Sequence, residues 1–317
     1  MGLTSAAIKG EASRLGFDLC GIAPAANLPD LQHFTEWIAR GYAGEMHYLA
    51  RTAAKRADVT RVLPSVRSVI VLGTLYNVDR PYSTELLDPG VARIARYARG
   101  DDYHDVLKTR LDALVAWMTG AHGAALEARA YVDTGPVQER AFAQQAGLGW
   151  TGKNTCLINP VLGSWLFLSV VLCNVDLTAD EPGLDRCGTC TLCLEACPTA
   201  AFVEPWVMDA RRCIAYLTIE SRSPAPPDLE PAIGSHVFGC DVCQEVCPWN
   251  DRAPVSPDPA WQPRAPFDHP PLATLAALTP GQLEEAVKGS AIRRAGPDGL
   301  RRSLDVAMRN LAARGHV

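Results

Sequence analysis

The sequence predicts an α+β protein in three parts: an α/β domain over residues 1–176, a cysteine-rich module over residues 177–252, and a proline-rich linker with a short helical tail over residues 253–317. Three observations lead to this prediction. Helical and strand-like patterns alternate up to about Asp176, eight of the 11 cysteines lie in the second part, and prolines are frequent between residues 253 and 271. A chain of 317 residues is long enough for two or three domains with buried cores.

Amphipathic spacing predicts the helices of the first part, and short apolar runs predict its strands. Helices are expected at residues 4–15, 31–40, 46–51, 104–119 and 137–145, and strands at residues 17–23, 66–73, 93–97, 128–132, 156–160 and 164–172. Residues 66–73 give the clearest strand, because the run is β-branched, apolar and closed by glycine. In the tail, Thr279 begins a capping motif for one helix, and a last helix is expected from Asp298.

The composition, 48% apolar and 21% charged residues, is that of an ordinary soluble globular protein. The longest apolar run, Trp165 to Cys173, is too short to span a bilayer and predicts a buried strand. The first residues lack the charged and apolar regions of an export signal, and Ala6 breaks the myristoylation pattern. We therefore expect a cytoplasmic monomer with no membrane partner.

Charge is distributed unevenly along the chain. The net charge of −5 argues against a nucleic-acid partner for the chain as a whole. From Ala286 onward, however, the sequence has seven basic residues and only two acidic ones, Asp298 and Asp305. A local positive face can bind phosphates, although a solvated helix surface explains the same pattern equally well. The candidate phosphate contacts are Lys288, Arg293, Arg294, Arg301 and Arg302.

The most specific motif is the run CGTCTLCLEACP at residues 187–198. It fits the C-x2-C-x2-C-x3-C-P pattern of two-cluster ferredoxins, in which the fourth cysteine serves the other cluster. A second set follows, with Cys213 and then CDVCQEVCP at residues 240–248. We assign one [4Fe–4S] cluster to Cys187, Cys190, Cys193 and Cys247, and the other to Cys197, Cys213, Cys240 and Cys243.

Other uses of these cysteines fit the pattern less well. Zinc sites usually pair two C-x2-C hooks and do not need this run, and disulfides are not expected in a chain without an export signal. Cys20, Cys156 and Cys173 stand singly in apolar surroundings and are expected to be buried thiols.

Asp133 ends an expected strand and precedes a Thr-Gly-Pro turn. In α/β folds such positions gather reacting groups, but a helix-capping or turn carboxylate is the more common role for aspartate there. The glycine-rich loop at residues 147–154 could let backbone amides approach a ligand, but it matches no nucleotide motif, so a plain loop is the stronger explanation. The run from Asp102 to His104 begins like the D-x-H-x-x-G cobalamin motif, but Leu107 stands where the motif has glycine. We interpret His104 as a structural or hydrogen-bonding residue.

Several stretches together resemble the epoxyqueuosine reductase family. They are GEMHYL (44–49), IARYARGDDYH (94–104), YVDTGPV (131–137), GWTGKN (149–154), LGSW (162–165), DARRCIAYLTIE (209–220), FGCDVCQEVCPWN (238–250) and GSAIRRA (289–295). The resemblance extends through nearly the whole chain. Longer members of the family continue into helical HEAT-like repeats, whose RNA contacts we expect this chain to lack.

The resemblance implies a cobalamin-binding N-terminal domain, a ferredoxin-like module with two [4Fe–4S] clusters, and reduction of the epoxide of epoxyqueuosine at the tRNA wobble position. It implies that Asp133 donates the proton. An acid at neutral pH would need a pKa raised above the usual value of about 4, through burial or a neighbouring carboxylate. The stretches expected to line the cobalamin contain Arg56, Tyr97, Asp133, Lys153, Asn154 and Ser164. The resemblance also implies that a flavodoxin or ferredoxin supplies the electrons and that the protein binds the anticodon stem-loop of the tRNA.

Two functions of other classes use similar parts. A plain electron carrier of the ferredoxin type would use the same eight cysteines, but would not need the first 176 residues. A cobalamin-dependent reductive dehalogenase shares the plan of cobalamin and two clusters, but its respiratory examples carry a twin-arginine signal. Binding of anticodon stem-loop RNA separates the reductase from both.

Overall fold

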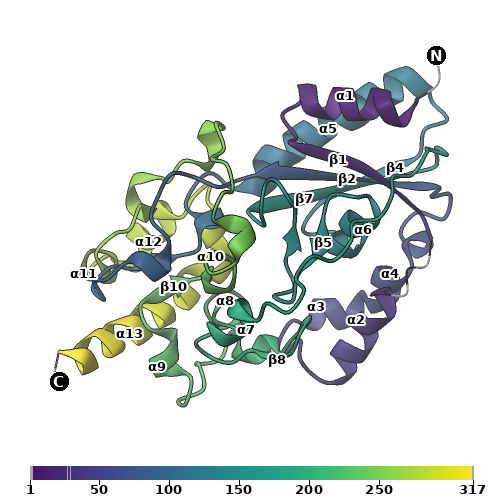
Figure 1. The fold of residues 1–317 in the computed structure, drawn as a ribbon. Coiled ribbons are helices and arrows are strands. Elements are labelled where there is room, and N and C mark those ends of the chain that lie inside the picture. The colour runs from purple at the N-terminus through teal and green to yellow at the C-terminus, as the bar shows by residue number, and fades with distance from the viewer. Residues whose placement is uncertain (1–2, 27, 29, 316–317) are drawn as a thin grey trace.

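A four-stranded antiparallel sheet organises the first half of the chain in the computed structural model, which describes residues 3–26, 28 and 30–315 (Figure 1). The strand order is β1-β2-β7-β4, with bounds Leu19–Pro24, Ser68–Leu75, Leu166–Cys173 and Ala128–Val132. Every residue of β2 is buried, as its β-branched and apolar composition requires. β2 and β7 form the centre of the sheet, and β1 and β4 form its edges.

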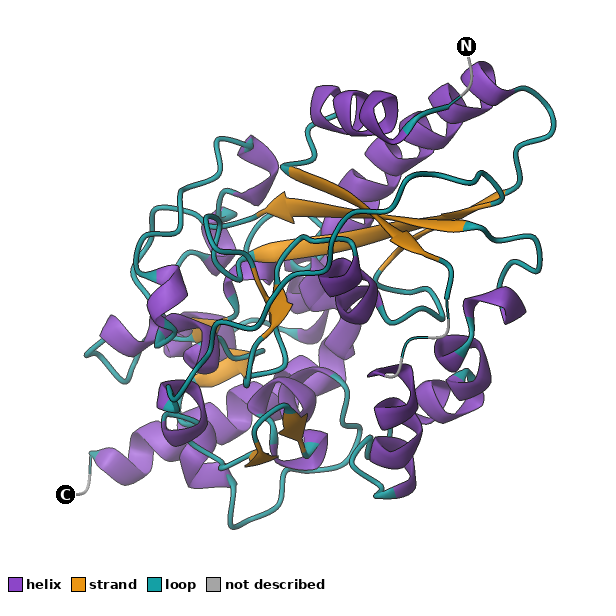
Figure 2. Ribbon diagram, turned by 45° about the vertical axis from the view of Figure 1, so that its right-hand side comes forward, coloured by secondary structure: helices purple, strands orange, loops and turns teal. Residues whose placement is uncertain are grey.

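Helices cover both faces of this sheet (Figures 1 and 2). On one face, Ile70 and Leu72 pack with residues of α1 (Ser5–Arg14) and α5 (Tyr103–His122). On the other face, Val69 and Val71 pack with Phe142 of α6 (Glu139–Gln145) and with Leu31 of α2 (Asp30–Ala39). Two short helices, α3 (His47–Arg51) and α4 (Ala53–Ala57), follow α2.

The cysteine-rich part consists of short elements joined by loops. Its helices are α7 (Leu192–Glu195), α8 (Ile214–Ile219), α9 (Glu230–Ile233) and α10 (Val242–Glu245), and its strands are β8 (Phe202–Glu204), β9 (Val207–Met208) and β10 (His236–Phe238). Strand β10 pairs in parallel with β3 (Arg93–Ile94), which joins this part to the first. A short hairpin lies between β3 and β10 in the sequence and consists of β5 (Trp150–Thr151) and β6 (Leu157–Ile158).

The C-terminal part packs against the same core as the sheet. It contains α11 (Leu272–Ala276), α12 (Pro280–Ala286) and α13 (Gly296–Arg314), and Thr279 caps α12 with the expected capping box. The proline-rich segment before it is also packed: Trp261 and Phe267 are buried in the cluster that contains α1 and α5. Single 3-10 turns lie at residues 59–61, 83–85, 96–98, 210–212, 248–250, 259–261, 265–267 and 291–295.

The structure confirms a mixed α/β architecture and corrects two expectations. The strands of the central sheet all pair antiparallel, so the comparison of the Asp133 position with the strand ends of α/β folds does not apply. The strand expected at residues 93–97 stops at Ile94, because the Asp241 carboxylate accepts a hydrogen bond from the Arg96 backbone at 2.6 Å and a 3-10 turn follows. Within the described residues, no helix is both long and apolar enough to cross a membrane.

Candidate active site

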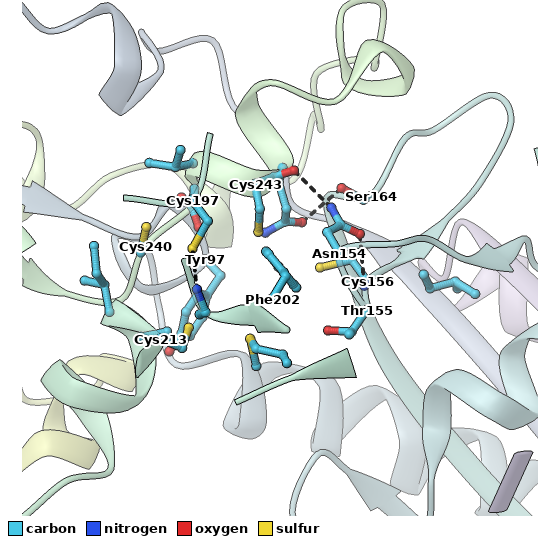
Figure 3. A pocket seen from close by; sticks show the side chains of 18 of the residues that line it. Tyr97, Asn154, Thr155, Cys156, Ser164, Cys197, Phe202, Cys213, Cys240 and Cys243 are labelled. Atoms are coloured by element: carbon cyan, nitrogen blue, oxygen red, sulfur yellow. Dashed lines mark hydrogen bonds between the residues drawn. The ribbon is translucent and has the colours of Figure 1, made fainter. Parts of the chain in front are cut away.

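A cavity of about 280 Å³ lies where the first part of the chain meets the cysteine-rich part (Figure 3). Four of its lining residues are Cys197, Cys213, Cys240 and Cys243, the set that the sequence assigned to one cluster. The lining also includes Tyr97, Asn154 and Ser164, three of the residues expected at the cobalamin. One space thus joins a cysteine set to the first part of the chain.

Cys247 of the other expected set is buried, and Cys187 packs against the same small cluster. Burial, followed by the charges of Cys193 and Cys187, raises the pKa of the Cys247 thiol to about 11. Cys193 is influenced in the same way by Cys187 and Cys190. Within the described chain, no three His, Cys, Asp or Glu side chains converge closely enough to hold a single ion. A cubane takes one thiolate per iron, so each set of four cysteines supplies the ligands of one cluster.

Polar side chains fasten the cysteine loops to the first part of the chain. Asn154 donates to the Cys243 carbonyl at 3.0 Å, and the Ser164 hydroxyl donates to Gln244 Oε1 at 3.0 Å (Figure 3). Asn250 accepts from the Ser164 backbone at 2.7 Å, and a Cβ at Gly163 would lie only 2.1 Å from Asn250 Oδ1. Glycine is therefore required there for the two parts to approach.

Lys153 and Arg56 lie outside the lining of this cavity. The Lys153 ammonium donates to the carbonyls of Gly188 and Cys190 at 2.6 and 2.9 Å and so holds the first cysteine loop. The Arg56 guanidinium donates to the Val137 carbonyl at 2.9 Å, and so supports the loop that follows Asp133. Both cations position backbone in this structure.

Asp133 directly follows β4 and has a left-handed backbone, with φ of 58°. Aspartate tolerates this conformation better than most residues, and such strain is typical of functional sites. The turn after it needs a glycine, because a Cβ at Gly135 would lie 2.3 Å from the Tyr131 ring. Although 67% of the Asp133 side chain is accessible, the carboxylate is held at Oδ2, where the Tyr103 hydroxyl donates to it at 3.0 Å. Its charge also reaches Tyr97 on the cavity wall, where it adds to the burial that raises the tyrosine pKa.

His104 lies between two carboxylates. Its Nδ1 is 2.8 Å from Asp102 Oδ1, and its Nε2 is 3.6 Å from Asp133 Oδ2. Against the opposing effect of burial, these two partners raise the pKa of His104 to about 9. The hydrogen-bonding interpretation of His104 is confirmed, and both ring nitrogens are engaged within the protein.

The pKa of Asp133 moves in the direction opposite to the one a resting acid requires. Burial raises it, but the hydrogen bond and charge of His104 and the hydroxyl of Tyr103 outweigh burial and lower it. Asp133 is therefore a carboxylate at neutral pH in this structure, and the proton lies on His104.

Glu139 is a residue near the site that the sequence analysis missed. Burial, and then the charge of Asp133, raises the pKa of the Glu139 carboxyl to about 8. Its Oε1 is buried without a hydrogen-bond partner in the described part of the chain. The only sequence signal was its place in the first helical turn after the Asp133 loop, which also suits an exposed glutamate.

The five basic residues proposed for RNA all have partners within the chain. Arg301 donates to the Ala276 carbonyl at 2.7 Å and also contacts that of Leu278, and Arg302 donates to the Ser221 carbonyl at 2.7 Å. The other three pair with carboxylates but remain largely exposed: Lys288 with Glu285 (67% exposed), Arg293 with Asp102 (60%) and Arg294 with Glu220 (53%).

The three single cysteines differ from the expectation of uniformly buried thiols. Cys173 is buried in β7, whereas Cys20 and Cys156 are only partly buried. Cys156 also lines the cavity, together with Cys243. The expectation of an isolated apolar setting is wrong for Cys156.

Fold and site together define a redox protein with a double iron–sulfur module joined to an α/β domain. Residues 186–250 match the family described as 4Fe-4S double cluster binding domain, and residues 56–134 match the family described as epoxyqueuosine reductase QueG. An epoxyqueuosine reductase of Gloeobacter violaceus is 47% identical over 318 residues, covering 97% of each chain.

Solved structures agree with these matches. A crystal structure of epoxyqueuosine reductase with an epoxyqueuosine-modified tRNA-Tyr stem loop has a TM-score of 0.87 and 29% identity, covering 96% of this chain and 80% of that one. A Bacillus subtilis epoxyqueuosine reductase, with its aspartate-bearing catalytic loop swung out of the active site, has a TM-score of 0.84 and 28% identity, covering 96% and 81%. This chain belongs to the epoxyqueuosine reductase family.

Proposed function

We propose that this protein reduces the epoxide of epoxyqueuosine at the wobble position of tRNA to the cyclopentene of queuosine. The observation that carries the proposal is the shared cavity, whose lining combines four cysteines with Tyr97, Asn154 and Ser164 of the first part; the cysteines are Cys197, Cys213, Cys240 and Cys243. Relatives that share almost the whole chain are named for this reaction, and one was crystallised with its modified stem loop.

Cobalamin and two [4Fe–4S] clusters are the cofactors of this family, and the residues present fit both. We assign Cys187, Cys190, Cys193 and Cys247 to one cluster, and Cys197, Cys213, Cys240 and Cys243 to the other, the one at the cavity. Tyr97, Asn154 and Ser164 would face the cobalamin, with Arg56 and Lys153 holding the adjoining loops. We do not assign His104 to the cobalt, because its Nδ1 lies 2.8 Å from Asp102 Oδ1 and its Nε2 lies 3.6 Å from Asp133 Oδ2.

When bound, cobalamin and the clusters supply the electrons and the low-valent cobalt that open the epoxide. The chain's own contribution is placement and the proton. Both contacts of Asp133 fall on Oδ2, which leaves Oδ1 to face the epoxide oxygen. Tyr103 orients the carboxylate, because its hydroxyl donates to it and its ring stacks on His104 with centroids 4.0 Å apart. Once it has taken up a proton, Asp133 is the group that protonates the departing oxygen.

Three further assignments complete the proposal. Lys288, Arg293 and Arg294 contact RNA phosphates, while Arg301 and Arg302 hold helix and loop ends. A flavodoxin or ferredoxin donates the electrons. The protein works as a monomer in the cytoplasm, where tRNA is modified.

The test of Asp133 is Asp133→Asn in single-turnover formation of queuosine from epoxyqueuosine-containing tRNA. The change keeps size and shape but removes the transferable proton, so the rate should fall by about 10²–10⁴-fold. Asn serves almost as well as Asp in turns, so a merely structural role would cost little.

The matched control is Asp105→Asn, which removes an exposed carboxylate from the first turn of α5. Cobalamin content and both cluster spectra should match wild type in the two variants. A near-normal rate for Asp133→Asn with intact cofactors would show that the proton comes from another group.

A further inference from the structure

The reaction consumes more protons than Asp133 can hold. Converting an epoxide to an alkene takes two electrons and two protons: both C–O bonds break, a C=C bond forms, and the oxygen leaves as water. The electrons come from the reduced cobalamin of the proposed function, on which this inference rests. One carboxyl carries one proton at a time, so Asp133 must be reloaded while substrate covers its Oδ1 face.

The arrangement around His104 provides a transferable proton. Asp102 is buried and caps α5, so its Oδ1 accepts from the His104 backbone at 3.1 Å and faces Nδ1 at 2.8 Å. Asp133 Oδ2 faces the other nitrogen at 3.6 Å. A neutral imidazole has one N–H and one lone pair, so one of these nitrogens would point its lone pair at a carboxylate. The geometry is satisfied when both nitrogens carry protons, or when the carboxyl of Asp133 holds the second one.

We propose that His104 is the residue that reloads Asp133, passing its Nε2 proton to Oδ2 for each of the two protonations. The Asp133 carboxylate first takes the Nε2 proton of His104 on Oδ2, turns about its Cβ–Cγ bond to present that proton, and protonates the epoxide oxygen as one C–O bond breaks. After His104 has regained a proton, Asp133 takes it in the same way and delivers it to the hydroxyl, which leaves as water as the second C–O bond breaks. His104 regains its proton from solvent, which reaches the 31% of its side chain that is exposed.

Tyr103 does not compete for this role, although its hydroxyl meets the same oxygen. Burial and the charge of Asp133 raise the pKa of Tyr103 well above 10, so the phenol keeps its proton and serves as a fixed donor. The other charged groups around the pair are Asp102, Arg293 on the far oxygen of Asp102, and Glu139 and Arg140 near Asp133. Among these, Asp102 orients the ring, because it is the carboxylate on Nδ1.

The test compares His104→Gln with His122→Gln, an exposed histidine at the end of the same helix, in protein with verified cofactors. Single-turnover rates are measured from pH 6 to 10 with an epoxyqueuosine-containing anticodon stem-loop. Wild type and His122→Gln should hold a constant rate up to about pH 9, the pKa of His104, and fall above it. His104→Gln should be slower by about 10²-fold at pH 8 and should speed up as the pH falls, because solvent must then protonate Asp133 directly. A His104→Gln profile parallel to wild type would overturn the proposal.

Two further measurements separate proton supply from structure. ¹⁵N-histidine spectra of the holoenzyme, assigned by the signal missing in His104→Gln, should show both ring nitrogens protonated at pH 7.5; a neutral tautomer there would overturn the proposal. Asp102→Asn keeps the imidazole and should move the fall in rate to lower pH, and an unmoved fall would count against it. A wild-type enzyme that forms no queuosine would refute the proposed function, whereas the spectra would still test His104.

Discussion

At the scale of the residue, Glu139 makes stability depend on pH. Its carboxyl has a pKa of about 8 in the folded chain against an ordinary value of 4.5, because it is buried near Asp133. The unfolded chain therefore loses this proton first, so stability is full below about pH 4.5, declines through that window and levels off above about pH 8. The loss is on the order of a few kcal/mol. Glu139→Gln removes the ionisable group, so its melting temperature relative to wild type should rise from pH 5 to pH 8.

A matched control for Glu139 is Glu284→Gln, which changes an exposed glutamate in α12. Its melting temperature should track that of wild type across the same range. A difference between Glu139→Gln and wild type that does not vary with pH would mean that Glu139 ionises normally in the folded protein.

The sequence predicts those site residues that act together with near neighbours in the chain. The cysteines are recognisable because the spacing of cluster-binding thiolates follows a fixed sequence pattern. The pairing of His104 with Asp133 is not recognisable in the sequence, because Asp133 lies at the end of another element. Arg293, which pairs with Asp102 beside them, belongs to the C-terminal part. The direction of the Asp133 pKa shift depends on its pairing with His104. A neighbour of opposite charge, rather than the neighbouring carboxylate that we expected, decides it.

At the scale of the element, the turn before α13 both pairs with other parts of the chain and carries two of the residues expected to contact RNA. Arg293 and Arg294 pair with Asp102 and Glu220 but keep more than half of their side chains exposed. Exposed ion pairs contribute little to stability, so a phosphate can compete for these guanidinium groups. Replacing both with Ala should weaken tRNA binding and flatten its salt dependence by roughly one unit of slope for each phosphate that the variant no longer neutralises.

The control for the double variant is Arg309→Ala, on α13 after the turn, where the side chain pairs with Glu230. It removes a similar charge away from the turn and should leave the slope of the binding curve unchanged. Equal affinity and slope in wild type and in the Arg293 and Arg294 double variant would mean that this turn only holds the tail in place.

Elements were predictable where one physical cause dominates. The strands β2 and β7 follow from apolar, β-branched runs, and α12 from its capping box. The strand at residues 93–97 failed because a distant carboxylate, Asp241, binds the backbone there and bends it into a turn. The antiparallel pairing was hidden as well, because alternating helices and strands suit either direction.

At the scale of the whole molecule, the two cysteine sets occupy different surroundings, and this predicts different consequences of losing each cluster. Cys190 is exposed in the first cysteine loop, whereas Cys243 lines the cavity and its carbonyl accepts from Asn154. Anaerobically reconstituted wild type should hold about eight irons per chain, and Cys190→Ser and Cys243→Ser should each hold about four. Only Cys243→Ser should also lower cobalamin binding, because its cluster forms part of the cavity wall.

The measurements for this last prediction are iron, sulfide and cobalamin content per chain, with Cys173→Ser as the control. Cys173 is a buried thiol of β7 outside both sets, so it should keep about eight irons. Tightly bound zinc in place of iron and sulfide would contradict the assignment of the cysteines. Equal cobalamin content in the Cys190 and Cys243 variants would contradict the shared wall, because a cluster remote from the cavity does not touch the other cofactor and cannot affect its binding.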